Sequence, residues 1–336
     1  MTRKSSIGVW IDPGWIAAAQ LEKTREGVSL RASVVLERGP GAGEHLSEEE
    51  AQRLVGTLGR VGFTGSAVTL GAAEPSLVSA PLEIPPVSSG APVEKIASGE
   101  LAKMYRLQPG SFGVGVWDLP APAASRDRPG VMAVALPHKS AEASIAPLEG
   151  AGLDVAAIDA HQSAAARALS LIVPQGRGEV DCVVDFGSDM VRIVVVYEGV
   201  VVYTRSAKQS GVGDLERSVI ESLDLDDDVV WYALYAVGLD ESDERWALLS
   251  DVRERIRAWA EPIQRETAAA LDYARRRHQT ECAGRLLASG RPPAGVSALV
   301  ASSCDTAEAA PVLPGDQTPA DPRLVVAMGL AARFDT

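Results

Sequence analysis

The chain has 336 residues, enough for two domains that each bury a core of their own. Lysine and arginine total 32 and aspartate and glutamate total 45, which gives a net charge of −13. A surface this acidic repels nucleic acid and anionic lipid headgroups, so neither is expected as a general partner. The sequence has no apolar run of membrane-spanning length and no signal peptide, which predicts a cytoplasmic protein without direct membrane insertion.

The cysteines and histidines indicate neither a disulfide framework nor a metal site. Cys182, Cys282 and Cys304 lie far apart, and no two of them form a CxxC pair. The four histidines are scattered, and none has the spacing of a metal ligand or a catalytic triad. We therefore name no catalytic residue from the sequence.

The first strands of the chain are repeated in its middle. Each copy reads as strand, Asp-x-Gly, strand, Glu-Gly turn and strand. The predicted strands are residues 7–11, 16–21 and 28–35 in the first copy, and 182–184, 191–197 and 200–203 in the second. Because the Asp-x-Gly occupies the same joint both times (Asp12 to Gly14 and Asp185 to Gly187), the repeat predicts two related lobes.

The remaining predicted elements lie between and after these copies. Helical spacing or strand composition predicts helices at 91–105, 141–149, 159–171 and 214–223, and paired strands at 112–119 and 131–136. A long amphipathic helix follows, with Val252, Ile256 and Leu271 on one face, and Pro262 is expected to kink or restart it. A closing helix is predicted at 324–334.

The paired Asp-x-Gly turns favour phosphate binding. Glycine lets the backbone approach a phosphate, backbone amides can donate to phosphate oxygens, and an aspartate can hold magnesium through water. One turn from each lobe would clamp the phosphates of a nucleotide between the lobes. Asp12 and Asp185 are the candidate magnesium ligands.

Several segments carry a family resemblance. Residues 9–22 and 183–209 resemble the phosphate loops of the actin, sugar kinase and heat-shock chaperone superfamily. Segments of the PilM family of type IV pilus assembly proteins are similar, in the same order, to residues 151–153, 158–159, 164–168, 209–215, 261–277, 286–290 and 326–331. The resemblance covers nearly the whole chain. It implies an α/β actin-like ATPase (ribonuclease H-like) fold with two related lobes and an inserted subdomain.

The resemblance also implies domain boundaries. The first lobe would span residues 1–175, with the inserted subdomain at about 87–155. The second lobe would span 178–320. Residues 321–336 would form a closing helix that returns to the first lobe.

By the same resemblance the cofactor would be ATP with magnesium. The implied nucleotide-binding residues are Asp12, Gly14, Asp185, Gly187, Ser188, Gly211, Gly213, Glu261, Arg265, Ser289 and Gly290. The chain departs from the family pattern in the first loop, where Pro13 removes an amide donor and Trp15 places a large ring. It departs again after Gly290, where Arg291 and two prolines replace further glycines. These departures predict a degraded nucleotide site without hydrolysis.

The resemblance implies a scaffold rather than an enzyme. PilM-like proteins bind the N-terminal tail of a bitopic PilN-like protein at the cytoplasmic face of the inner membrane, and so connect it to the pilus motor. The tail would lie in a groove between the first lobe and the inserted subdomain. Such a peptide can bind by main-chain pairing and a few apolar anchors. The sequence does not identify the groove residues, and it leaves self-association open.

Three alternatives remain open from the sequence. An active ATPase or small-molecule kinase of the same superfamily would need an intact phosphate loop and a catalytic base. A relative of FtsA would continue into an amphipathic membrane helix, whereas this sequence is expected to stop after its closing helix. A cytoplasmic domain of a GspL-like secretion protein would precede a transmembrane segment.

Overall fold

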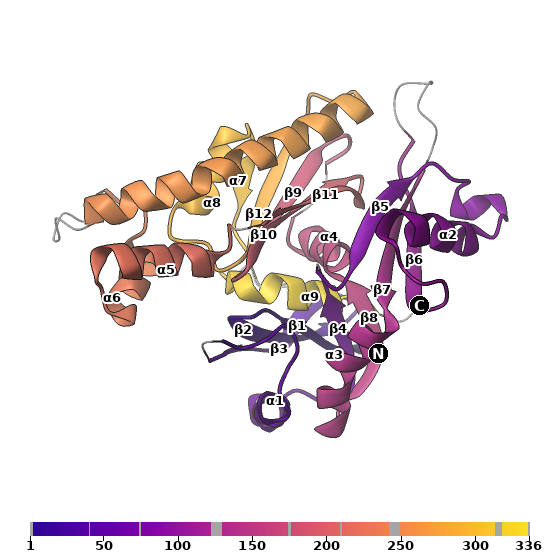
Figure 1. Ribbon diagram of the computed structural model, residues 1–336, viewed down its shortest axis with the longest axis horizontal. Coiled ribbons are helices and arrows are strands. Elements are labelled where there is room, and N and C mark those ends of the chain that lie inside the picture. Colours follow the sequence, from indigo (N-terminus) through magenta and orange to yellow (C-terminus); the bar gives the residue numbers. More distant parts are fainter. Residues whose placement is uncertain are drawn as a thin grey trace.

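The computed structural model describes residues 3–39, 41–73, 75–121, 130–173, 176–208, 210–241, 249–312 and 318–334. The described chain forms two five-stranded sheets and one three-stranded sheet (Figure 1). Helices α4 (His161–Ile172) and α9 (Val325–Ala331) lie between the two larger sheets and contact strands of both. One face of each larger sheet therefore packs against the same pair of helices.

The first sheet has the strand order β3-β2-β1-β4-β8. Its strands are β1 (Arg3–Ile11), β2 (Trp15–Lys23), β3 (Val28–Glu37), β4 (Ala67–Ala72) and β8 (Asp154–Ala160). The first three pair antiparallel, and β4 and β8 are added in parallel. Since side chains alternate along a strand, Ile7 and Val9 face α1 (Glu48–Val61) and α3 (His138–Gly150), whereas Trp10 faces α4 and α9.

The second sheet repeats this topology. Its order is β11-β10-β9-β12-β13, again with three antiparallel strands followed by two parallel ones. The strands are β9 (Val180–Phe186), β10 (Met190–Tyr197), β11 (Val200–Lys208), β12 (Ala283–Gly290) and β13 (Ala307–Ala309). The prediction of two related lobes is confirmed, because the repeated unit supplies the first three strands of each sheet.

The outer face of the second sheet is covered by helices (Figure 1). These are α5 (Val212–Leu223), α6 (Asp227–Trp231), the π-helix η2 (Tyr232–Val237), α7 (Leu249–His278) and α8 (Val296–Ser303). Helix α7 continues through Pro262, so the predicted restart there is wrong. Proline at this position leaves the carbonyl of Ala258 without its helical donor, and Ala258 is exposed to solvent.

The third sheet forms the inserted subdomain. It has the order β5-β7-β6 and consists of β5 (Val78–Leu82), β6 (Phe112–Asp118) and β7 (Val131–Pro137), with α2 (Val93–Tyr105) packed against it. A short 3-10 turn, η1 (Val87–Ser89), precedes α2. The insert therefore begins and ends earlier than the expected 87–155. Residues 154–160, part of which was expected to begin a helix, instead form β8, because they pair with β4.

Small residues at the contacts of the helices between the sheets allow close packing. A Cβ added at Gly329 of α9 would lie 1.9 Å from the carbonyl oxygen of Ala164 in α4, and one at Gly8 of β1 would lie 2.1 Å from the carbonyl oxygen of Ala327. A 3-10 turn, η3 (Pro322–Leu324), leads into α9, all of which is buried. Among the described residues no helix has the length and apolar character needed to cross a membrane.

Candidate functional site

The two Asp-x-Gly turns contact each other at the boundary between the lobes. Residues 12–15 close a tight turn, in which the amide of Asp12 donates to the Trp15 carbonyl at 2.9 Å. The carboxylate of Asp12 accepts a hydrogen bond from the amide of Gly14 at 2.9 Å. It also accepts from the amide of Ser188 in the second lobe, at 3.3 Å to Oδ1 and 3.2 Å to Oδ2. Asp12 therefore binds the turn that follows β9.

The glycines of both turns are needed for this approach. A Cβ added at Gly14 would lie 2.2 Å from Oγ of Ser188, which is closer than real Cβ contacts come. A Cβ added at Gly187 would lie 2.7 Å from Nη1 of Arg192 and 3.0 Å from Oδ2 of Asp12. A side chain at Gly14 would thus overlap with Ser188 of the opposite turn. A side chain at Gly187 would overlap with Arg192 and come close to Asp12.

The start of α5 is bound to the second turn. The amide of Val212 donates to the carbonyl of Gly187 and the amide of Gly213 to that of Ser188, both at 3.0 Å. A Cβ added at Gly211 would lie 2.3 Å from the carbonyl oxygen of Ser188. These first amides of the helix, which could otherwise bind an anion, are used within the protein.

Asp185 lies fully buried beside two basic side chains. His161 Nε2 is 3.0 Å from its Oδ2, and Arg192 Nη1 is 3.5 Å from the same atom. Burial by itself would raise the pKa of Asp185, but the charges of His161 and Arg192 and the hydrogen bond from His161 outweigh it and lower this pKa. The buried carboxylate is accordingly ionised and bound by protein groups.

Sequence reasoning missed both of these partners. Arg192 had a signal, since it is the one charged residue in β10, a strand that is otherwise apolar apart from its terminal tyrosine. Arg192 also pairs with Asp189 at 3.3 Å. His161 had no such signal, because only the packing of α4 against the second sheet brings its ring to Asp185.

The pKa of Asp12 is raised to about 6. Burial is the main cause, and the nearby charge of Asp185 adds to it. Hydrogen bonds from Ser188 and Gly14 and the charge of Arg192 act in the opposite direction without cancelling the effect of burial. Asp12 therefore changes protonation between weakly acidic and neutral pH.

Ser289 and Gly290 end β12 beside this network. Ser289 is buried and is the strand partner of Asp185. Gly290 has a φ of +77°, and a Cβ there would lie 2.3 Å from the carbonyl oxygen of Phe186. The backbone conformation and the close approach both require glycine at this position.

Arg291 follows Gly290 and reaches across to the first lobe. Its guanidinium carbon lies 5.3 Å from the centre of the Trp15 ring and 5.4 Å from that of Tyr235. Its Nη1 is 3.6 Å from Glu37 at the end of β3. This side chain adds a cation–π contact and an ion pair between the lobes.

Glu261 and Arg265 lie apart from this network. They form an ion pair with each other at 3.2 Å on the exposed surface of α7. Within the described part of the chain, no contact joins either of them to Asp12, Asp185 or Ser188.

A cleft of about 780 Å³ opens beside the two turns, between the lobes. Gly14, Ser188, Gly213 and Arg291 line it. Its charged lining residues are five acids (Glu37, Asp189, Asp214, Glu216 and Asp227) and three arginines (Arg38, Arg217 and Arg291). The lining therefore has more acidic than basic groups, which is unfavourable for a polyanion.

A second hollow, the insert groove, separates the inserted subdomain from the first lobe and has a volume of about 520 Å³. It is lined by Leu77, Gly113, Val114, Gly115, Val116, Trp117, Val134, Leu136, Ile158, Asp159, Ala160, Ser163, Arg167 and Arg333. The long walls are β6 of the insert and β8 of the first sheet. Each of these strands is the last one of its sheet.

No protein-family model and no curated protein matches this sequence. Solved structures do match the fold. A chain in the structure of a PilM-PilN type IV pilus biogenesis complex is similar with a TM-score of 0.74 at 18% identity, over 98% of each chain. The ethanolamine utilization protein EutJ from Carboxydothermus hydrogenoformans matches with a TM-score of 0.52 at 16% identity, over 98% of this chain and 89% of its own.

The chain has the actin-like ATPase fold. The actin-like fold that the family resemblance implied is thereby confirmed, and so is the resemblance to PilM at the level of the fold. The candidate phosphate loops predicted from the sequence are the turns that begin at Asp12 and Asp185. The sequence identities of these two structures to the chain, 18% and 16%, are low, so the matches show the fold alone.

Proposed function

We propose that this protein is a PilM-like assembly scaffold, which binds the cytoplasmic N-terminal tail of a PilN-like inner-membrane protein in the insert groove and does not turn over nucleotide. The observation that carries the proposal is the pair of strand edges along that groove. Through such a partner the protein would be held at the cytoplasmic face of the inner membrane and connected to the pilus motor.

The edges of β6 and β8 offer backbone groups to an extended peptide. Among the described residues β6 pairs only with β7, and β8 only with β4. Each strand therefore has a row of amides and carbonyls that its own sheet does not use, and a peptide can add to such an edge by main-chain hydrogen bonds. This mode of binding needs neither a metal nor a nucleotide.

The face of β6 toward the groove has space for side chains of a peptide. Val114 and Val116 pack against the core of the insert, so Gly113 and Gly115 project from the other face. A Cβ added at Gly113 would meet no atom within 4 Å. Glycine at this position keeps the groove open, and the apolar side chains of Leu77 and Ile158 can receive the anchors of the peptide.

The groove also selects by charge. Arg167 is paired with Asp159, whereas Arg333 is exposed and has no ion-pair partner among the described residues. The groove therefore has one unpaired positive charge although the protein as a whole is acidic, and this charge favours a tail that carries an acidic residue near Arg333.

The nucleotide position does not fit magnesium and phosphate. Asp12 already accepts amides from Gly14 and Ser188, and Asp185 is bound by His161 and Arg192, whose charge repels a cation. Magnesium needs an octahedral set of oxygen ligands with several waters, which a fully buried Asp185 cannot provide without breaking these contacts. The proposal of a non-catalytic role is supported by these contacts, in which protein groups already bind the carboxylates of Asp12 and Asp185.

The test is a binding assay with a fluorescently labelled synthetic tail of a PilN-like protein from the same organism. Gly113→Leu should fold normally and weaken binding strongly, because the new side chain occupies the groove. The matched control is Gly59→Leu on α1, where an added Cβ also meets nothing within 4 Å. Equal affinity of the two variants for the tail would reject the insert groove as the binding site.

Calorimetric titration with Mg·ATP tests the second part of the proposal, that the protein does not use nucleotide. We expect no heat of binding up to millimolar nucleotide. Micromolar binding in the 780 Å³ cleft would instead favour the alternative, a nucleotide-binding ATPase or kinase.

A further inference from the structure

Trp231 of α6 is an exposed aromatic side chain in the lining of the interlobe cleft. It is 55% exposed, so most of one large apolar ring lies open to solvent. The cleft shares no lining residue with the insert groove. Because tryptophan is a frequent anchor of binding surfaces, this ring is available to a ligand that enters the cleft.

The wall beside Trp231 already holds one guanidinium group of the protein itself. The guanidinium carbon of Arg291 lies 5.3 Å from the centre of the Trp15 ring and 5.4 Å from that of Tyr235. The Tyr235 ring is in turn the neighbour of Trp231, with ring centres 6.0 Å apart. Among the described residues no cation lies over the ring of Trp231. The cleft therefore has one aromatic ring that can receive a cation from outside.

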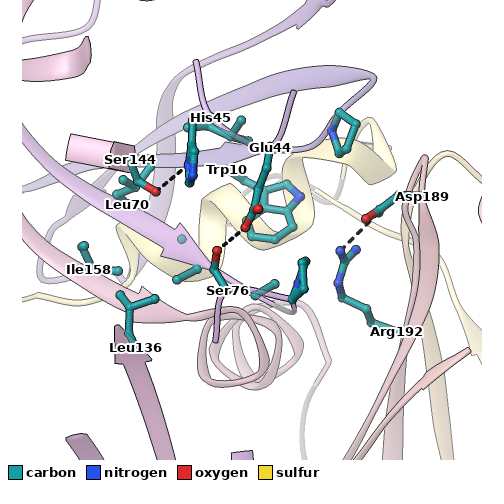
Figure 2. A pocket seen from close by; sticks show the side chains of 16 residues that line it. Trp10, Glu44, His45, Leu70, Ser76, Leu136, Ser144, Ile158, Asp189 and Arg192 are labelled. Carbon is teal, nitrogen blue, oxygen red and sulfur yellow. Dashed lines mark hydrogen bonds and ion pairs between the residues drawn. The ribbon is translucent and has the colours of Figure 1, made fainter. Parts of the chain in front are cut away.

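The arginines of the cleft are already paired with carboxylates. The three pairs are Arg38 with Glu50 at 2.7 Å, Arg217 with Asp214 at 3.1 Å and Arg291 with Glu37 at 3.6 Å. Asp189, another acid of the lining, is paired with Arg192 at 3.3 Å (Figure 2). None of these positive charges is therefore free to balance a further carboxylate.

Two carboxylates of the lining, Glu216 and Asp227, have no ion-pair partner in the part of the chain that the structure describes. Asp227 precedes Trp231 by four positions in α6, so the two side chains lie on the same face of the helix. Glu216 accepts a hydrogen bond from the hydroxyl of Tyr235, the ring next to Trp231. The unbalanced negative charge of the cleft thus lies close to its open aromatic ring.

These features together select an arginine side chain. A guanidinium is planar, stacks on aromatic rings, and can donate two hydrogen bonds to one carboxylate, whereas an ammonium is a compact and strongly hydrated charge. The volume of the cleft, about 780 Å³, leaves room for the residues that flank such an arginine in a peptide. The net charge of −13 also attracts a basic segment to this protein.

We propose that the interlobe cleft binds an arginine side chain from a basic segment of a partner protein, with the guanidinium stacked on Trp231 and paired with Asp227. This would be a second docking point beside the insert groove, and it does not depend on a tail bound there.

A blocked pentapeptide of sequence GRGRG is the probe, and the same peptide with citrulline in place of both arginines is its uncharged counterpart. Two-dimensional ¹H–¹⁵N NMR of the full chain at low ionic strength locates the site. The chain has six tryptophans, and the indole signal that is absent from Trp231→Phe belongs to Trp231. Addition of GRGRG should shift this signal, whereas the citrulline peptide should leave it in place.

Anisotropy titrations with fluorescently labelled GRGRG measure the affinities of matched variants. Tyr273→Ala is the control for Trp231→Ala, because Tyr273 is also an exposed aromatic, 40% exposed, and lies on α7 outside the cleft. Asp228→Asn is the control for Asp227→Asn, because Asp228 is an exposed acid of the same helix that does not line the cleft. Each pair thus makes the same chemical change inside and outside the site.

We expect Trp231→Ala to weaken binding about fivefold, the loss of one cation–π contact, and Asp227→Asn about threefold, the loss of one exposed ion pair. Both control variants should bind as the native protein does. The proposal is overturned if GRGRG does not bind at millimolar concentration or if the citrulline peptide binds as tightly. It is also overturned if either cleft variant keeps the affinity of its control.

Discussion

The backbone amide of Ser188 donates to the carboxylate of Asp12 across 176 positions of sequence, at 3.2 Å to the nearer oxygen. This bond joins the two lobes through their two Asp-x-Gly turns. The protein thus fills with its own atoms the space between its two Asp-x-Gly turns. The consequences concern stability, pH dependence and the choice of ligand.

Asp12 should make the protein less stable as the pH rises. Its folded pKa is raised from 3.8 to about 6, so the folded state holds this proton more tightly than the unfolded chain. The stabilisation is fully present below the unfolded value and is lost as the pH rises through about 6. It amounts to on the order of 3 kcal/mol in the free energy of unfolding.

Urea denaturation between about pH 4 and pH 7 measures this effect. Asp12→Asn should remove the Asp12 contribution, so the variant should gain stability relative to the native protein as the pH rises. Asp154→Asn, at an exposed position of β8, is the control and should keep the native pH dependence. Parallel curves for Asp12→Asn and the native protein would contradict the raised pKa.

Asp185→Ala should destabilise the protein severely at neutral pH. The substitution leaves Arg192 and His161 buried without their shared carboxylate, and breaking a buried pair in this way costs about 3–5 kcal/mol. Because the pKa of Asp185 is lowered, its contribution is present above the ordinary carboxyl pKa and is lost as the pH falls. Chemical denaturation at neutral pH checks the loss, with Asp154→Ala as control, and a cost below about 1 kcal/mol would count against the network.

Pro262→Ala should stabilise the protein. The substitution restores an amide that can donate to the carbonyl of Ala258 and removes the steric conflict of proline inside α7. Proline is about 3 kcal/mol less favourable than alanine in a helix interior, so we expect a gain of about 1–3 kcal/mol, seen as a higher melting temperature in calorimetry. An unchanged or lower melting temperature would mean that the helix requires the proline for its packing.

Arg333→Glu should weaken binding of the partner tail in a salt-dependent way. The exposed arginine lines the insert groove, and an exposed ion pair contributes about 0.2–1 kcal/mol, so we expect a loss of several-fold at low ionic strength. Anisotropy titrations at two salt concentrations measure it. Arg276→Glu, at an exposed site on α7 of the second lobe, controls for the change in net charge, and an equal loss in both variants would exclude a local role for Arg333.

The two related lobes were predictable because their signals are local. Strands and turns are encoded in short patterns, and the repeated unit around Asp12 and Asp185 indicated two lobes before any contact was known. The sequence did not reveal β4 and β8, whose parallel pairing depends on partners far along the chain. The insert boundaries were misplaced for this reason. Pro262 predicted a kink or a restart, but α7 continues from Leu249 to His278 as one helix.

The sequence by itself predicted the repeated strand unit and its two Asp-x-Gly turns, since alternating strands and glycine turns act over a few residues. The actin-like fold was implied by the resemblance to a known family. The sequence also showed that Pro13, Trp15 and Arg291 depart from the pattern of the family that it resembles. Only the tertiary structure decided what these residues contact: Ser188 on Asp12, His161 and Arg192 on Asp185, and the open edges along the insert groove. Burial and close approach depend on every element around a group, and no short pattern encodes them.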